Sequence, residues 1–179
     1  MAKVTITFDN GPEPPITHHV LDVLAQHGIK TSFYVIGRKM ESEEGRAAVV
    51  RAKAEGHWIG NHSYSHSISL GTSDDLAIYD AEVTRSQEII GALAHPDRLF
   101  RPFCNAGVMD TRVFKRGHIQ QLAADGYTCV MFNAVTRDWE DRELPIHLVH
   151  HEGRLSAAKT RVFIDFAATL LRAEADRLA

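Results

Sequence analysis

The sequence predicts an α/β domain built on a mainly parallel sheet or barrel. Three observations support this prediction: the chain has 179 residues, 44% of them are apolar, and strand-like and helix-like segments alternate along it. A length near ~150 residues is typical of one domain, and this apolar content excludes a disordered chain. Because helices usually connect parallel strands, such alternation favours a parallel α/β architecture.

Six short segments have the composition of strands. The first alternates valine, isoleucine and phenylalanine with threonine, and it ends at the turn residues Asp9-Asn10-Gly11-Pro12. The fifth, 127–132, is almost continuously apolar, which predicts a strand covered on both faces. The expected strands are 4–8, 31–36, 57–60, 99–102, 127–132 and 146–150.

Helices are expected between these strands because apolar residues recur there at helical spacing. Gly28 and Gly56 end the first two, as glycine commonly does at a helix C-terminus, and Ser73 is expected to cap the long third helix. The expected helices are 15–27, 43–55, the segment after 73, 111–125 and 157–178. The predicted buried faces are Ile16, Val20, Val23, Leu24 and His27 in the first helix and Leu76, Tyr79, Val83, Ile90 and Leu93 in the third.

Charge and composition exclude several classes of protein. The formal net charge is −3, so the chain has no basic field for phosphate-driven nucleic-acid binding. No apolar run approaches the ~18 residues of a membrane span, and the N-terminus lacks a signal-peptide pattern, so a cytoplasmic protein is expected. The two cysteines, Cys104 and Cys129, do not make a disulfide framework and are expected to be small buried apolar residues.

Polar residues gather after the carboxyl ends of the predicted strands, where α/β folds carry their reactive groups. The chain holds 11 histidines, and neutral imidazole is a common metal ligand and acid–base group. The polar residues that follow successive strands are Asp9 and Asn10, His62 and His66, Arg101, and Asp138 with Trp139. Their repeated placement at one edge of the sheet predicts a functional site there.

His62 and His66 are spaced for a shared ligand. Side chains four residues apart on a helical turn face the same side, so two imidazoles can bind one ion. With one oxygen ligand, this set leaves an open position for water, as in a catalytic metal site. Asp9 would then serve as the base for hydrolysis. The alternatives are two solvated loop histidines and an ordinary turn at Asp9-Asn10-Gly11-Pro12.

Four short motifs and one strand segment occur in an order and spacing shared with a known family. They are Thr7-Phe8-Asp9-Asn10-Gly11-Pro12, the segment from Gly28 to Gly37, His62-Ser63-Tyr64-Ser65-His66, Phe100-Arg101-Pro102-Phe103 and Arg137-Asp138-Trp139. Over roughly residues 3–142 the chain resembles the polysaccharide deacetylases, carbohydrate esterase family 4. The third motif has one residue fewer than the family's Arg-x-Pro-Tyr/Phe.

The resemblance implies a distorted (β/α) barrel with fewer units than the eightfold form, and an incomplete barrel if the last units are missing. It also implies hydrolysis of acetamides or esters on acetylated sugars. By position, Asp9 would be the general base, and Asn10, His62 and His66 would be the metal ligands. Zinc is the expected ion, with cobalt or nickel chemically acceptable.

Further residues take supporting roles in the same resemblance. Arg101 would orient Asp9, and Asp138 would hold Arg101. Trp139 would form a wall of the substrate pocket, and the backbone N–H near Phe103 would help to stabilise the oxyanion.

Two positions depart from the family pattern. Asn10 stands where the family has a metal-binding aspartate, and its neutral carbonyl oxygen should bind a metal more weakly. The family's last motif, Leu-x-His, supplies a general-acid histidine, and Leu148-Val149-His150 fits it. Only ten residues separate Trp139 from His150, too few for the usual helix and a full strand. His150 is therefore either the general acid or a strand histidine of another segment.

The tail has a second resemblance, which runs from Leu144-Pro145-Ile146-His147 through Gly153 to Phe166. It is similar to the last strand and helix of the effector-binding domain in LysR-type transcriptional regulators. No helix-turn-helix precedes it, so DNA binding is not implied. We therefore expect a deacetylase-like domain, 1–143, and a strand–helix tail, 144–179, that packs on it as a replacement unit or a fusion remnant.

The sequence favours a metal-dependent hydrolase that removes acetyl groups from acetylated carbohydrate, its expected partner. The alternative is a catalytically impaired or vestigial carbohydrate-binding homologue, which Asn10 and the missing last motif support. A third interpretation, based on the tail alone, is a regulator fragment that binds a small effector. The sugar, the bond cleaved and the oligomeric state are left open.

Overall fold

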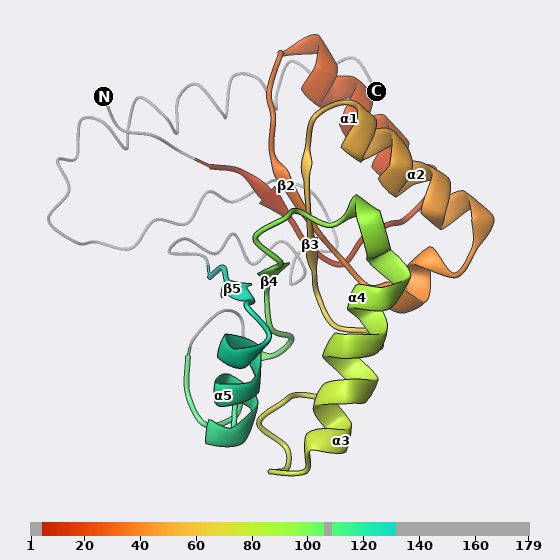
Figure 1. Cartoon of the computed structure of the whole chain (residues 1–179). Coiled ribbons are helices and arrows are strands. Elements are labelled where there is room, and N and C mark those ends of the chain that lie inside the picture. The colour runs from red at the N-terminus through yellow and green to blue at the C-terminus, as the bar shows by residue number, and fades with distance from the viewer. Residues whose placement is uncertain (1–4, 106–108, 132–179) are drawn as a thin grey trace, which may run out of the picture. The chain divides into compact units, whose positions relative to one another are not determined.

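The computed structural model describes residues 5–105 and 109–131, which form a parallel sheet with helical connections (Figure 1). The sheet has five strands in the order β1-β2-β3-β4-β5, and every neighbouring pair is parallel. Each strand therefore pairs with the one that precedes it in the sequence, and this confirms the predicted α/β architecture. The strands are Thr7–Phe8, Ser32–Val35, Trp58–Asn61, Leu99–Phe100 and Thr128–Cys129.

Helices connect these strands, and Figure 1 shows α1 and α2 running side by side. In α2, the side chain of Ser42 accepts the backbone N–H of Gly45 and so caps the first turn. Glu43 and Glu44 lie in that turn, where the helix dipole favours negative charge. The helical segments are α1 Ile16–Gln26, η1 Gly37–Met40, α2 Glu43–Ala54, α3 Leu76–Tyr79, η2 Asp80–Thr84, α4 Arg85–Ile90, η3 Gly91–Leu93 and α5 Arg116–Ala124.

The core consists of two apolar clusters. The larger joins β2 and β3 to α1, α2 and α4, and the smaller joins α3 and α5 to β4. Burial of one such side chain stabilises the fold by ~1.5–3 kcal/mol. The larger cluster contains Leu21, Leu24, Phe33, Val35, Met40, Val49, Ala52, Ile59 and Ile90.

The buried face of α1 differs from the predicted one. Ile16, expected to point inward, is 62% exposed, and His27 is also exposed. The buried residues are Thr17, Leu21 and Leu24. Because the hydroxyl of Thr17 accepts the Glu13 backbone N–H at 2.8 Å, the first turn presents Thr17 to the core, and Leu21 and Leu24 follow on the same face.

The long helix after 73 also begins later than predicted. Its N-cap is Asp75, whose carboxylate accepts the Ala77 N–H at 2.9 Å, whereas Ser73 caps only the turn before it. Leu76 is the first helical residue and is 46% exposed, so its predicted burial is wrong. The predicted burial of Tyr79, Val83 and Ile90 is confirmed.

Two predictions near the end of the described chain are also corrected. The helix expected at 111–125 begins only at Arg116, because Phe114 pairs with Leu70 in a parallel bridge. The strand expected to be covered on both faces is the short, exposed β5, and Cys129 within it is exposed rather than buried. Within the described residues, β5 has a neighbouring strand on one side, β4, which leaves its other edge open.

The expected strand at 146–150, the helix at 157–178 and the domain boundary after 143 lie outside the described residues, and they stay predictions. In the part of the chain that the structure describes, no helix is both long and apolar enough to cross a membrane.

His57 predicts a pH dependence of stability. It is 1% exposed, and burial, its main influence, lowers its pKa below the usual 6.5. The unfolded state therefore binds more protons as the pH falls below about 6.5, so stability decreases in that range. In His57→Asn the loss of stability between pH 7 and pH 5 should be less steep, as measured from urea unfolding midpoints. A slope equal to that of the unchanged protein would contradict this.

Candidate functional site

The centre of the site is the buried guanidinium of Arg101, which directly follows β4. Its side chain is 2% exposed, and its Nη1 atom donates to Asp9 Oδ1 at 2.6 Å and to Thr7 Oγ1 at 2.8 Å. Its Nε atom donates to the carbonyl oxygen of Val130 at 2.9 Å. The structure thus places Arg101 against Asp9, the contact that the family resemblance implies.

Tyr34 on β2 forms a platform beneath Arg101. The guanidinium carbon lies 3.9 Å from the centre of the Tyr34 ring, a cation–π distance. Burial raises the pKa of Tyr34 to about 12, so the phenol stays neutral. Gly60 on β3 leaves room for this ring, since a Cβ atom there would lie 2.6 Å from two of its carbons.

His62 follows β3 and faces Asp9. Its Nδ1 atom lies 2.8 Å from the Arg101 carbonyl oxygen, so we assign the ring proton to Nδ1 and a free lone pair to Nε2. Nε2 is 3.9 Å from Asp9 Oδ2. Burial lowers the pKa of His62, which favours the neutral imidazole that metal binding requires.

His66 lies beside His62, with 4.9 Å between the two ring centres. The ring of Phe103 is 4.4 Å from that of His66 on another side. Burial, followed by the charges of His62 and Lys39, lowers the pKa of His66 to about 4. The expected histidine pair is therefore adjacent and neutral near pH 7.

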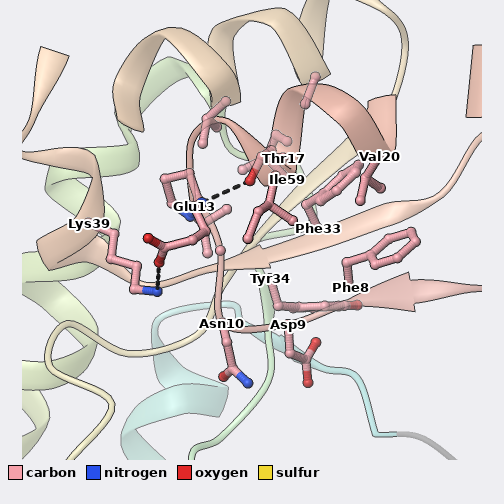
Figure 2. Close-up of a pocket in the computed structure, with 16 residues that line it drawn as sticks. Phe8, Asp9, Asn10, Glu13, Thr17, Val20, Phe33, Tyr34, Lys39 and Ile59 are labelled. Atoms are coloured by element: carbon pink, nitrogen blue, oxygen red, sulfur yellow. Dashed lines mark hydrogen bonds and ion pairs between the residues drawn. The ribbon is translucent and has the colours of Figure 1, made fainter. Parts of the chain in front are cut away.

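Asn10 occupies the loop after β1 in a left-handed conformation, with φ of 70°, that asparagine tolerates better than most residues. Figure 2 shows its exposed carboxamide extending on the same side of the loop as Asp9, away from Glu13 and Lys39. Within residues 5–105 and 109–131, no three side chains of His, Cys, Asp or Glu converge to hold a metal ion. Two neutral imidazoles fit a divalent metal, and the third ligand would be a neutral oxygen such as that of Asn10.

A cavity of about 290 Å³ lies on the other face of β1 and β2, between the sheet and α1 (Figure 2). Asp9 and Asn10 border it, and the Glu13–Lys39 ion pair, 2.6 Å long, stands at its edge. Its lining is mainly apolar and includes residues of the larger core cluster, such as Phe33. His62, His66 and Arg101 are not among the residues that line it, so we place the candidate site around these three side chains and Asp9 rather than in the cavity.

The sequence analysis did not single out as site residues Thr7 and Tyr34, which contact Arg101, or Gly60, which leaves room for the Tyr34 ring. The sequence could have indicated Thr7, because residues two apart on a strand point to the same face and Thr7 is two residues before Asp9. Three of the expected site residues, Asp138, Trp139 and His150, lie outside the described residues.

Residues 2–127 match the family model described as polysaccharide deacetylase. A peptidoglycan-N-acetylglucosamine deacetylase of Bacillus cereus is 36% identical over 102 residues, 56% of this chain and 36% of the relative. A chitooligosaccharide deacetylase of Bradyrhizobium is 30% identical over 139 residues, 76% of this chain and 58% of the relative. This chain therefore covers 36% to 60% of the length of the first three curated relatives.

A family 4 carbohydrate esterase from Streptomyces lividans, solved in complex with acetate, is similar in structure. The TM-score is 0.62 at 27% sequence identity, over 76% of this chain and 66% of that one. This similarity confirms the predicted fold class.

Gly60 provides a test of the support beneath Arg101. In Gly60→Ala the new methyl group should displace the Tyr34 ring and lower the free energy of unfolding by ~1–3 kcal/mol, as overpacking typically does. Thermal and urea unfolding measure the change. The matched control is Gly117→Ala on α5, where the nearest atom to a new Cβ is 3.9 Å away, and stability should not fall. Equal stability of both variants would contradict the packing argument.

Proposed function

Because the chain belongs to the polysaccharide deacetylase family, we propose that it is a hydrolase that removes acetyl groups from N- or O-acetylated carbohydrate. The observation that carries this proposal is the position of the Asp9 carboxylate. One oxygen receives a hydrogen bond from the buried Arg101, and the other faces the neutral His62. The names of the relatives, which act on peptidoglycan or chitooligosaccharide, favour an N-acetylated sugar as the substrate.

Asp9 is proposed as the general base. Arg101 fixes Oδ1, and this leaves Oδ2 to accept a proton from the water that attacks the acetyl carbonyl. The ring of Phe103 beside His66 would form an apolar wall, and the backbone N–H near it would donate to the developing oxyanion. We also propose that Asp138 holds Arg101, that Trp139 contacts the sugar and that His150 protonates the leaving group.

The proposed metal ligands are His62, His66 and Asn10, and zinc is the proposed ion, with cobalt or nickel as substitutes. When bound, the metal would polarise the acetyl carbonyl and acidify a water molecule. The hydrogen bond from His62 Nδ1 to the Arg101 carbonyl supports this assignment, because metal-binding histidines usually donate their other N–H in this way. The cytoplasmic location expected from the sequence stays a prediction.

A second candidate function is carbohydrate binding without efficient hydrolysis. It is favoured by the neutral Asn10, since no three His, Cys, Asp or Glu side chains of the described residues are placed to hold a metal ion. Metal content and acetate release distinguish the two candidates.

Asp9→Asn should lower the rate of hydrolysis by ~10²–10⁴-fold while metal content is retained, because the amide cannot accept the proton. The assay is acetate release from acetylated chito-oligosaccharide and from an acetyl ester, combined with metal analysis. Asp97→Asn, at a largely exposed side chain, is the control and should remain active. Full activity of Asp9→Asn would assign the base to another residue.

Asn10→Asp should increase zinc affinity, because a carboxylate adds charge and aspartate also tolerates the left-handed backbone at this position. Calorimetric titration of the metal-free protein measures the affinity. The double variant Asn10→Asp with His66→Ala should lose the gain if the ion binds at this site. Equal or weaker zinc binding by Asn10→Asp would show that residue 10 is not a ligand.

A further inference from the structure

The loop that carries both histidines, 61–66, is held by the helix that follows it. Asn61, at the start of the loop, is 1% exposed, and its Nδ2 atom donates to the carbonyl oxygen of Val83 at 3.0 Å. Its Oδ1 atom accepts the Ser63 N–H at 2.9 Å. A single buried side chain therefore connects the loop backbone to the helix.

Glu82 makes the second connection, and it is the contact nearest to His66. The Glu82 side chain is 2% exposed, and its Oε2 atom accepts the backbone N–H of Ser65 at 2.9 Å. Ser65 directly precedes His66 in the chain. A buried carboxylate that accepts a backbone N–H makes a stronger hydrogen bond than a neutral acceptor does. Glu82 thus holds the Tyr64–Ser65 peptide group, which lies one residue before His66.

The local helix geometry brings these contacts together. Residues Asp80–Thr84, η2, form a π-helical turn in which the Arg85 N–H bonds to the Asp80 carbonyl oxygen. The wider turn inserts an extra residue between α3 and α4, and such turns are frequent at functional sites. Two consecutive residues of this turn therefore contact the histidine loop: Glu82 through its side chain and Val83 through its carbonyl group.

The middle of the loop is fixed from two sides. The carbonyl oxygen of Ser63 accepts the Ser86 hydroxyl at 3.2 Å and the Gly37 N–H at 3.0 Å. On the outer side, the guanidinium of Arg85 lies 3.7 Å from the centre of the Tyr64 ring. Residues 82–86 therefore contact the loop at Asn61, which precedes both histidines, and at all three residues that lie between the two histidines.

We propose that the π-helical turn sets the relative position of the two imidazoles, and that Glu82 is a positioning residue that acts on His66 through the Ser65 amide. The proposal rests on the proposed metal-dependent function, because the two rings then have to meet one ion. Glu82 itself does not touch the ion or the substrate.

The test compares Glu82→Ala and Glu82→Gln in the full chain, with Glu88→Gln as the matched control at an exposed carboxylate of α4. Zinc affinity is measured by calorimetry on metal-free protein, and Co²⁺ absorption spectra report the ligand geometry. Loss of the anchor should weaken zinc binding by ~10–100-fold in Glu82→Ala, as loss of an outer partner typically does. Glu82→Gln keeps an oxygen acceptor and should recover most of the affinity, and Glu88→Gln should equal the parent.

A third measurement does not depend on metal. The ring protons of His66 lie close to the Phe103 ring, so their NMR shifts in metal-free protein report the position of the imidazole. These shifts should change in Glu82→Ala, return toward the parent values in Glu82→Gln, and remain unchanged in Glu88→Gln. If the parent binds no zinc, the proposed metal site fails, while the NMR shifts still decide whether Glu82 positions His66.

The proposal is overturned if Glu82→Ala keeps the parent's His66 shifts, Co²⁺ spectrum and zinc affinity. A lower melting temperature with all three unchanged would assign Glu82 to stability alone. If Glu82→Ala does not fold, the decision rests on Glu82→Gln and on Asn61→Asp. The latter removes the N–H donor to Val83 while keeping the Oδ1 acceptor, and it should shift the His66 resonances without removing Glu82.

Discussion

A buried positive charge needs a fixed set of partners, and Arg101 is that charge in this protein. An arginine that is 2% exposed would be strongly destabilising if its counter-charge were removed, by several kcal/mol in typical cases. The partners come from separate strands and their flanking residues: Thr7 and Asp9 at β1, Tyr34 on β2, and the Val130 carbonyl group after β5. One side chain therefore links the beginning of the sheet to its last described strand.

The same residue also connects the sheet to the histidine pair through its backbone. The Arg101 carbonyl oxygen binds His62 Nδ1, while the Arg101 N–H donates to the carbonyl oxygen of Asn61 at 2.9 Å. The position of the imidazole consequently depends on the register between β3 and β4. Both histidines have lowered pKa values, mainly through burial, so near pH 7 the ring that faces Asp9, His62, and the His66 ring beside it are both neutral.

Periodicity was sufficient to predict the parallel sheet and the approximate positions of its five described strands. The approach of Arg101 to Asp9 was expected only from the family resemblance of the motifs. Contacts that depend on packing between distant elements were not predictable in this way. Nothing local indicates that Gly60 has to accommodate the Tyr34 ring, or that the helix after residue 75 contains a π-helical turn. The errors at Ile16 and Leu76 have a related cause: both lie in first turns, where caps and neighbouring elements decide which side faces the core.

The strand order has a consequence for the time at which the site is completed during synthesis. Each described strand pairs with the strand made just before it, so the sheet can grow as the chain leaves the ribosome. Arg101 and Asp9 are 92 residues apart, and the Val130 carbonyl group follows later still. Until β4 and Arg101 have been synthesised, Asp9 therefore lacks its counter-charge. The arrival of Arg101 supplies an ion pair in which the guanidinium is buried and the carboxylate stays partly exposed, and the residue after β5 adds the last acceptor.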